Sequence, residues 1–284
     1  MNRPAGFAVL TLGTLALGLG LVAAAPAIGE GKMTMVGSGR QNAIDTRALR
    51  ALRPGRPLVI AHRGYSERYA DNSRESFEAA IAAGADLIET DIRAAKDGVL
   101  VCVHDPDVEG DEVADLTSMQ LNKKGVLRLA EVLALAKGRI AVLLDIKLRD
   151  AEFPLRVHEE VQRAGVEHAV IFGLRSNTQV RTLRGQDSDV VILGFLKSYE
   201  RFPKFFDSGG DIARLWEEDV NAENLALARG SGRPVFVTAG HRQSGESPGD
   251  IKASRFKALM EAGIDGVLVN DPVLALGARG AASK

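Results

Sequence analysis

The chain has one cysteine, almost no net charge and no internal repeat, and each shortage argues against a class of protein. Because Cys102 is the single cysteine among 284 residues, no disulfide can form within the chain. We expect Cys102 to be a small buried apolar residue, since buried thiols are usually inert. The formal net charge of -1 gives neither the basic surface typical of nucleic-acid-binding proteins nor an acidic tail. The remaining composition, 45% apolar and 26% charged, is that of a globular protein.

The first segment, residues 1–27, is predicted to be an export signal. A basic start ending at Arg3 precedes a nearly all-apolar stretch, Phe7 to Ala25, and Ala25-Pro26-Ala27 is typical of a cleavage site. An uncleaved membrane anchor is the alternative, because roughly 20 apolar residues are enough to span a bilayer. Arg3 is the single arginine of this segment, so the segment lacks the arginine pair of a twin-arginine signal. In both cases we expect the rest of the chain to lie outside the cytoplasm: periplasmic, secreted or membrane-anchored.

Residues 28–56 are predicted to be a linker, and residues 57–284 a domain of alternating strands and helices. Apolar runs that predict strands lie at 58–63, 86–92, 140–147, 168–173, 190–196, 211–216, 234–239 and 264–270. Helix-like segments lie between most of them, at 74–81, 127–137, 151–164, 177–184, 222–229 and 251–262. Ser73 and Gly84 are placed to cap the first helix. This alternation predicts parallel βα units, and eight of them predict an α/β fold of the (β/α)8 TIM-barrel type.

One strand-like run does not fit the alternation. Residues 99–104 follow Lys96-Asp97-Gly98, and an Asp-Gly pair between apolar runs is typical of a tight hairpin. We therefore expect this run to pair antiparallel with the second barrel strand, as an extra β-hairpin strand added to the barrel.

Charged residues stand near the ends of several predicted barrel strands. Glu89 and Asp91 lie two residues apart and share a face of their strand, as do Asp145 and Lys147. Active sites of TIM barrels lie where the carboxyl ends of the strands meet, so these side chains are expected at one mouth. Three carboxylates with no cysteine among them favour Mg2+ or Ca2+ over zinc. The alternative is that they form ion pairs with basic residues, namely Arg63, Arg93 and Lys147.

Two histidines, His62 and His104, lie at the ends of strand-like runs beside these carboxylates. Histidine titrates near neutral pH, so both are candidates for a general acid or base, although each taken alone is equally well explained as structural. Arg63 and Lys147 provide cations for a phosphate or carboxylate. A metal, two cations and two histidines around one pocket predict a site that cleaves phosphodiesters.

The chain resembles a known family in a series of motifs. They are His62-Arg63-Gly64, Asp71-Asn72-Ser73, 84–91, Lys96-Asp97-Gly98, His104-Asp105, Asp145-Ile146-Lys147 and 263–272. In order and spacing they are similar to those of the glycerophosphodiester phosphodiesterase family, and the resemblance covers roughly residues 57–275. It implies a TIM barrel that hydrolyses glycerophosphodiesters to glycerol 3-phosphate and an alcohol, in glycerophospholipid breakdown. The expected partner is this small-molecule substrate and not a nucleic acid.

The resemblance also implies a role for each candidate residue. The divalent metal would be bound by three carboxylates, Glu89, Asp91 and Asp145. The acid–base pair would be the two histidines, His62 and His104. The phosphate would be bound by two cations, Arg63 and Lys147. In the family the glycerol 2-hydroxyl attacks phosphorus, the alcohol leaves, and water opens the cyclic phosphate.

The chain departs from the family pattern at four places. Asp145 and Asp71 stand where the family usually has glutamate, so both side chains are one methylene shorter. Residues 107–116 lack the Arg-Thr that usually follows the histidine–aspartate pair. The seventh-strand motif, Trp-Thr-Val-Asn in the family, reads Phe236-Val237-Thr238-Ala239. We expect Phe236 to substitute for the tryptophan that stacks on the glycerol.

Two alternative functions remain open for this barrel. A phospholipase-D-like hydrolase of intact phospholipids is favoured by the possible anchor and by four aromatic residues in a predicted loop at 199–206, although packing on the barrel is the simpler expectation for them. A non-catalytic phosphoester-binding barrel is favoured by the shortened Asp145 and the missing tryptophan, whereas the two histidines argue against it. Trp216 is expected in the core, with a place at the barrel mouth as the alternative, and His158 is expected on the surface of its helix.

Overall fold

The structure is a computed structural model that describes residues 56–230 and 232–281. The predicted export signal, residues 1–27, lies outside these residues, as does the predicted linker except for Arg56, so both stay predictions. Within the described part of the chain, no helix is long and apolar enough to cross a membrane.

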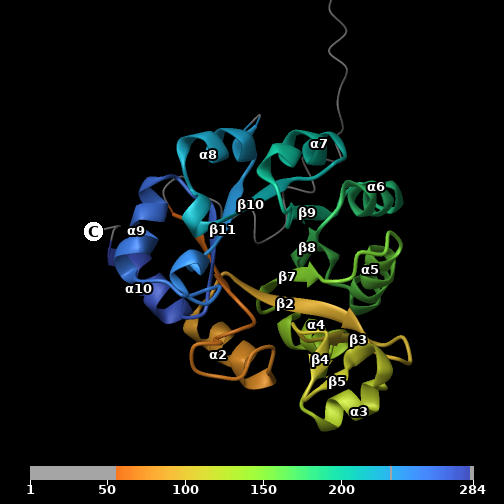
Figure 1. The fold of residues 1–284 in the computed structure, drawn as a ribbon. Helices are drawn as coiled ribbons and strands as arrows, with labels where there is room; N and C mark the ends of the chain where they lie inside the picture. Colours follow the sequence, from red (N-terminus) through yellow and green to blue (C-terminus); the bar gives the residue numbers. More distant parts are fainter. Residues whose placement is uncertain (1–55, 231, 282–284) are drawn as a thin grey trace, which may run out of the picture. The chain divides into compact units, whose positions relative to one another are not determined.

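Eight parallel strands form a closed ring (Figure 1). They are β1 (Leu58–Ala61), β2 (Leu87–Ala94), β7 (Ala141–Ile146), β8 (Val170–Leu174), β9 (Val191–Gly194), β10 (Ile212–Trp216), β11 (Val235–Thr238) and β12 (Gly266–Val269). Each strand pairs with the next, and β1 closes the ring by pairing with both β12 and β2. The predicted TIM barrel is confirmed, and each predicted barrel strand overlaps an observed one.

Helices cover the outside of the ring (Figure 1). They are α2 (Arg74–Ala83), α4 (Leu129–Ala136), α5 (Phe153–Ala164), α6 (Asn177–Gln186), α7 (Phe202–Asp207), α8 (Ala222–Arg229), α9 (Ala253–Glu261) and α10 (Pro272–Ala281). Short 3-10 helices are η2 (Val113–Asp115), η3 (Glu167–Ala169), η4 (Tyr199–Arg201), η5 (Glu217–Asp219) and η6 (Arg242–Ser244). The predicted caps of α2 are confirmed, because the Ser73 side chain accepts a hydrogen bond from the Ser76 N–H and Gly84 is left-handed, with φ 86°.

An insertion between β2 and β7 lies outside the ring. It contains β3 (Leu100–Cys102), β4 (Asp107–Val108), β5 (Asp111–Glu112), α3 (Ser118–Lys123) and β6 (Leu127–Arg128). β3 pairs antiparallel with β2, which confirms the extra hairpin strand, and β6 extends this edge by pairing with β3. Cys102 is buried in β3, and burial raises the pKa of its thiol to about 12, which agrees with an inert apolar role.

Alternation along the strands divides the apolar side chains into two cores, one between the sheet and the helices and one inside the ring. The inner core includes two phenylalanines, Phe195 and Phe236. Each has a glycine beside it: a Cβ on Gly173 would lie 2.4 Å from the Phe195 ring, and one on Gly266 would lie 2.7 Å from the Phe236 ring. These glycines therefore let the rings fill the barrel interior.

Two predictions about the barrel exterior are wrong. The aromatic segment 199–206 is not a loop but forms η4 and the start of α7, because its three phenylalanines recur at helical spacing and lie buried. Their packing on the barrel is as predicted. His158 is buried and not on the surface, since it shares the inward stripe of α5 with Val157 and Val161, and its Nε2 lies 2.9 Å from Asp187 Oδ2.

Candidate active site

The carboxyl ends of the barrel strands enclose a cavity of about 180 Å³, which we call the central cavity. This cavity is lined by inward-facing side chains that lie just beyond the apolar interior of the barrel, because each strand continues its two-residue alternation to the mouth. The predicted site residues on its wall are His62, Arg63, Glu89, His104, Asp145 and Lys147. The structure therefore brings together residues that are up to 85 positions apart in the sequence.

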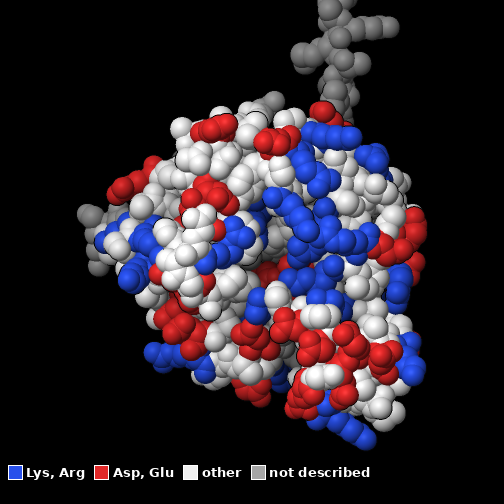
Figure 2. Space-filling model, viewed as in Figure 1, with Lys and Arg blue, Asp and Glu red and all other residues white. Residues whose placement is uncertain are grey.

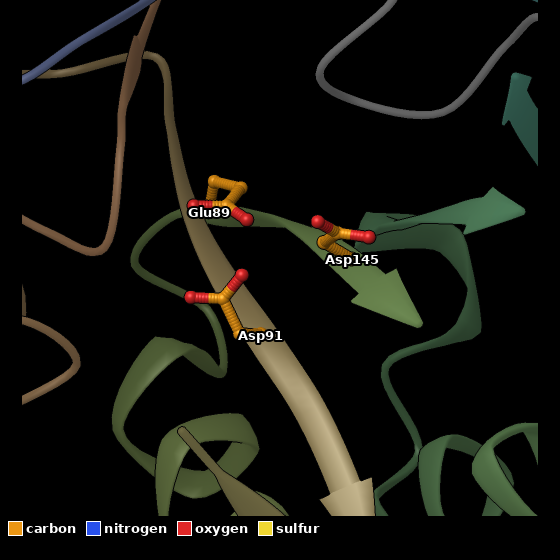
Figure 3. Close-up of side chains that lie close together, drawn as sticks. All are labelled: Glu89, Asp91 and Asp145. Carbon is orange, nitrogen blue, oxygen red and sulfur yellow. The ribbon is translucent and has the colours of Figure 1, made fainter. Parts of the chain in front are cut away.

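Three carboxylates, Glu89 and Asp91 from β2 and Asp145 from β7, point toward one another (Figure 3). The register of the two strands places Asp91 beside Asp145. One oxygen from each carboxylate lies within 4.8 Å of the others, and all three residues are buried. Burial and repulsion from Asp91 and Asp145 raise the pKa of Glu89 well above its usual value.

Two cations neutralise part of this carboxylate cluster. Lys147 Nζ lies 2.7 Å from Asp91 Oδ1 and 2.6 Å from Asp145 Oδ2, and Arg63 Nε lies 3.3 Å from Asp91 Oδ2. Burial alone would raise the pKa of Asp91, but the charges of Lys147 and Arg63 lower it to about 2. The expected ion pairs are therefore present for Lys147 and Arg63. Arg93 forms none of them, and donates to the carbonyl of His104 instead.

Glu89 is the carboxylate of the cluster with which these cations form no ion pair. Its Oε2 accepts a hydrogen bond of 3.0 Å from the Arg63 backbone N–H, and among the described residues no lysine or arginine forms an ion pair with its side chain. A buried carboxylate with a raised pKa, next to two others, is stabilised by a bound cation. The donor set is all oxygen, and it fits Mg2+ or Ca2+. Asn72 helps to orient it by donating to Asp91 Oδ2 at 2.9 Å.

His62 is held as a neutral imidazole. Asn270 donates from its side-chain nitrogen to the Pro248 carbonyl, at 3.0 Å, and to Asp250 Oδ1, at 2.8 Å, so its amide oxygen faces the histidine. This oxygen lies 2.8 Å from His62 Nδ1, which must therefore carry the proton and leave Nε2 as the acceptor. Burial and the neighbouring Arg63 charge lower the pKa of His62 to about 4.

His104 lies in a different environment on the wall of the same cavity. Its side chain is 40% exposed, and Nδ1 lies 2.8 Å from Asp105 Oδ1. A carboxylate at one ring nitrogen orients the imidazole. Because Arg93 fixes the His104 carbonyl through two hydrogen bonds, at 3.0 and 2.8 Å, this segment is tied to β2.

The structure does not bring Phe236 to the central cavity. Its ring is fully buried in the inner core, and Thr238, two residues further along β11, lines the cavity instead. The strand alternation correctly turns both residues inward, but Phe236 lies deeper in the barrel. Trp216, expected in the core, is half-buried and lines the cavity from the end of β10.

Three functional candidates were not singled out from the sequence. Arg175 Nη2 lies 2.5 Å from Asp145 Oδ1, Arg214 lines the central cavity, and Asn270 fixes His62. Each lies on the inward face at the end of a barrel strand, two residues after another inward residue. Extending the two-residue alternation beyond each apolar run identifies all three.

Fold and site together define a TIM-barrel protein of the phosphodiesterase type. The chain belongs to the glycerophosphoryl diester phosphodiesterase family, whose model matches residues 62–223, more than half of the sequence.

Known proteins of this kind match the chain over different lengths. A glycerophosphodiester phosphodiesterase of Bacillus altitudinis is 30% identical over 129 residues, 39% of this chain and 52% of that protein. The probable glycerophosphodiester phosphodiesterase 1 of Mycobacterium tuberculosis is 45% identical over 51 residues, 18% of this chain and 19% of that protein. The chain thus spans about half or less of the length of these curated relatives.

Solved structures match over most of the barrel. A glycerophosphodiester phosphodiesterase from Parabacteroides distasonis has a TM-score of 0.69 and 18% identity, and covers 81% of this chain and 99% of its own. A putative glycerophosphodiester phosphodiesterase from Galdieria sulphuraria has a TM-score of 0.68 and 17% identity, with 79% and 98% coverage. At these identities the structures support the fold.

Proposed function

We propose that this protein hydrolyses glycerophosphodiesters to glycerol 3-phosphate and an alcohol, with a divalent cation held by the carboxylate cluster. One observation carries the proposal: a neutral His62, a carboxylate-oriented His104 and three buried carboxylates surround one cavity. Membership of the family supports it. A phosphodiesterase of Oleispira antarctica, with a TM-score of 0.59 and 15% identity, was solved with the product sn-glycerol-3-phosphate.

The residues of the central cavity divide the chemistry between them. Glu89, Asp91 and Asp145 would hold a divalent cation, which would supply positive charge to the phosphate oxygens, where negative charge develops. Arg63 and Lys147, on the cavity wall, add to this positive field. His62 accepts the proton of the glycerol 2-hydroxyl at Nε2, because its Nδ1 is already committed to Asn270.

His104 completes the first step as the general acid. The glycerol 2-oxygen bonds to phosphorus, the bond from phosphorus to the alcohol oxygen breaks, and His104 protonates that oxygen. In the second step the roles reverse: His104 takes a proton from water, the water oxygen bonds to phosphorus, the bond from phosphorus to the glycerol 2-oxygen breaks, and His62 returns its proton to that oxygen. The products are glycerol 3-phosphate and the alcohol, and both histidines regain their starting states.

We further propose that the cation is Mg2+ or Ca2+ and that the protein acts outside the cytoplasm. The all-oxygen donor set supports the first proposal. The apolar segment and cleavage-type sequence of residues 1–27 support the second. Whether this segment is removed or anchors the protein decides whether the enzyme is free or membrane-bound.

The experiment that tests the activity is a product assay. Purified protein is incubated with glycerophosphoethanolamine or glycerophosphocholine, with Mg2+, Ca2+ or EDTA, and glycerol 3-phosphate is measured. We expect release that depends on the metal. No release with either metal, from folded protein, would refute the proposal, and hydrolysis of phosphatidylcholine vesicles in the same assay would favour the phospholipase-D-like alternative. The buried phenylalanines of α7 do not support that alternative, because they are not available to a membrane surface.

A further inference from the structure

A second cavity of about 570 Å³ opens beside the central cavity, and we call it the basic cavity. The two share Arg175, Phe195, Arg214 and Trp216 on their walls, so they are adjacent. The wall of the basic cavity also carries Lys197 and Arg242. Figure 2 shows lysine and arginine side chains gathered beside the hollow at the centre of this face. Asp219 is the carboxylate on this wall.

Arg214 is a buried cation without a carboxylate partner. It is 7% exposed, its Nε has no hydrogen-bond partner, and among the described residues no acidic side chain lies within ion-pair distance of it. Its guanidinium carbon lies 3.7 Å from the centroid of the Trp216 ring and 5.1 Å from that of Phe195. Burial lowers the pKa of Arg214 to about 10. A buried charge without a partner destabilises the folded protein unless an anion binds beside it.

The other groups of the basic cavity keep its charge positive. Arg242 stacks on the same indole ring at 4.0 Å and is neutralised by Glu218, at 2.6 Å, while Lys197 is exposed. Asp219 forms no ion pair with Arg214; its Oδ2 accepts the hydrogen bond of the Tyr199 hydroxyl and lies 3.7 Å from Arg242 Nη2. Arg214 and Lys197 are therefore the donors left for a ligand, and the Arg214 guanidinium lies over the Trp216 ring.

We propose that the basic cavity binds a second phosphate group, carried on the alcohol half of the substrate. This inference rests on the proposed function, since it supposes that the scissile phosphate lies at the carboxylate cluster. Guanidinium groups bind phosphate oxygens through paired hydrogen bonds, and Arg214 offers such a fork. Because Arg214 and Trp216 line both cavities, one substrate reaches from the cluster to the second phosphate.

The first test measures binding without turnover. Trp216 is the only tryptophan of the chain and lines both cavities, so its fluorescence reports on a ligand in either one, and the Lys197 variant described below assigns the change to the basic cavity. With EDTA present, we titrate the full chain with inositol 4-phosphate and, as the uncharged match, with inositol. We expect a saturable change with inositol 4-phosphate and none with inositol. Equal responses to both, or none to either, would overturn the proposal.

Variants assign the binding to named residues. Arg214→Gln is expected to weaken inositol 4-phosphate binding about tenfold or more, the size of a lost charged hydrogen bond. Lys197→Gln, which changes an exposed side chain and should fold normally, is expected to weaken it about threefold. Arg181→Gln, on the outer helix α6 and outside both cavities, is the matched control and should bind like the parent. Unaltered binding in the Lys197 variant and in a folded Arg214 variant would contradict the assignment.

The second test measures substrate preference, by comparing glycerophosphoinositol 4-phosphate with glycerophosphoinositol in the presence of Mg2+ or Ca2+. We expect kcat/KM to be about tenfold higher for the phosphorylated substrate, and Arg214→Gln to raise its KM more than that of glycerophosphoinositol. Hydrolysis of both at equal rates would overturn the second-phosphate site and leave the proposed function intact. A saturable change in tryptophan fluorescence with no hydrolysis of either substrate would overturn the proposed function and leave the second-phosphate site intact.

Discussion

Gly249 fixes the position of the proposed general base, so Gly249→Ala should abolish most of the activity. A Cβ at this position would lie 2.0 Å from Asn270 Oδ1 and 2.8 Å from His62 Nδ1, the two atoms of the bond that orients His62. Gly249 has little freedom to retreat. Its N–H donates to the Ala239 carbonyl at 2.7 Å, and its carbonyl accepts from the Asn270 N–H at 2.8 Å.

The size of the effect follows from the role of His62. General acid–base groups contribute about 10²- to 10⁴-fold to rate, so displacing His62 should lower kcat at least about 100-fold. This corresponds to about 2.7 kcal/mol of transition-state stabilisation. Backbone strain is a separate cost of about 1–3 kcal/mol, because Gly249 has φ +95°, a conformation that alanine rarely adopts.

Gly245→Ala is the matched control, because Gly245 lies nearby in the same connection with φ +80° and has no atom within 4 Å of a new Cβ. The Gly245→Ala variant has the backbone strain but no steric clash of its new Cβ. We would measure glycerol 3-phosphate release and thermal unfolding for both variants. We expect a stability loss in both variants, larger in Gly249→Ala because of the collision, but a large loss of kcat only in Gly249→Ala. Equal activity of the two variants would refute the claim that the His62–Asn270 bond positions the base.

Three further predictions concern ionisation in the central cavity. With Mg2+ kept saturating at every pH, kcat/KM should fall as the pH decreases toward about 4 and not near 6.5, because His62 must be neutral to accept a proton and its pKa is lowered to about 4. A pH–rate profile at saturating Mg2+ with its acid limb near 6.5 would contradict this. Mg2+ binding, measured by calorimetry, should tighten as the pH rises above the usual carboxylate range, because the raised pKa of Glu89 makes binding release a proton. An affinity that does not depend on pH would count against Glu89 as a ligand. In EDTA, Lys147→Met should lower the free energy of unfolding in urea by about 3 kcal/mol, because it removes the ammonium that Asp91 and Asp145 share and leaves these buried carboxylates with Arg63 and Arg175 alone. Lys124→Met, whose partners are exposed, should cost at most about 1 kcal/mol. Equal losses would contradict the ion-pair account.

The barrel was predictable because its signals are local. Apolar runs with charged ends recur at regular spacing, and Ser73 and Gly84 mark both ends of α2. The same alternation placed Glu89 and Asp91 on one face, and the parallel register of β2 and β7 then brings Asp145 beside them. A local pattern thus determined most of the carboxylate cluster.

Local patterns could not predict how deep a side chain lies in the barrel or which distant residues it contacts. Phe236 faces inward as expected, but nothing in the sequence around it shows that its ring lies against Gly266, one layer below the cavity. Asn270 lies 208 residues from His62, so their hydrogen bond appears only when the ring closes between β1 and β12. Arg214 was missed for a different reason, because a buried arginine without a carboxylate partner breaks the usual rule for charged residues.

The central claim is that the carboxylate cluster holds the cation on which hydrolysis depends. The most direct measurement titrates Mg2+ and Ca2+ into the metal-free protein and into its Glu89→Gln variant by calorimetry, and assays glycerol 3-phosphate release from the same samples. The account predicts one binding event in the parent protein, with activity that rises as this site fills, and loss of both in the variant. Full activity in EDTA, or unchanged binding and activity in Glu89→Gln, would contradict it.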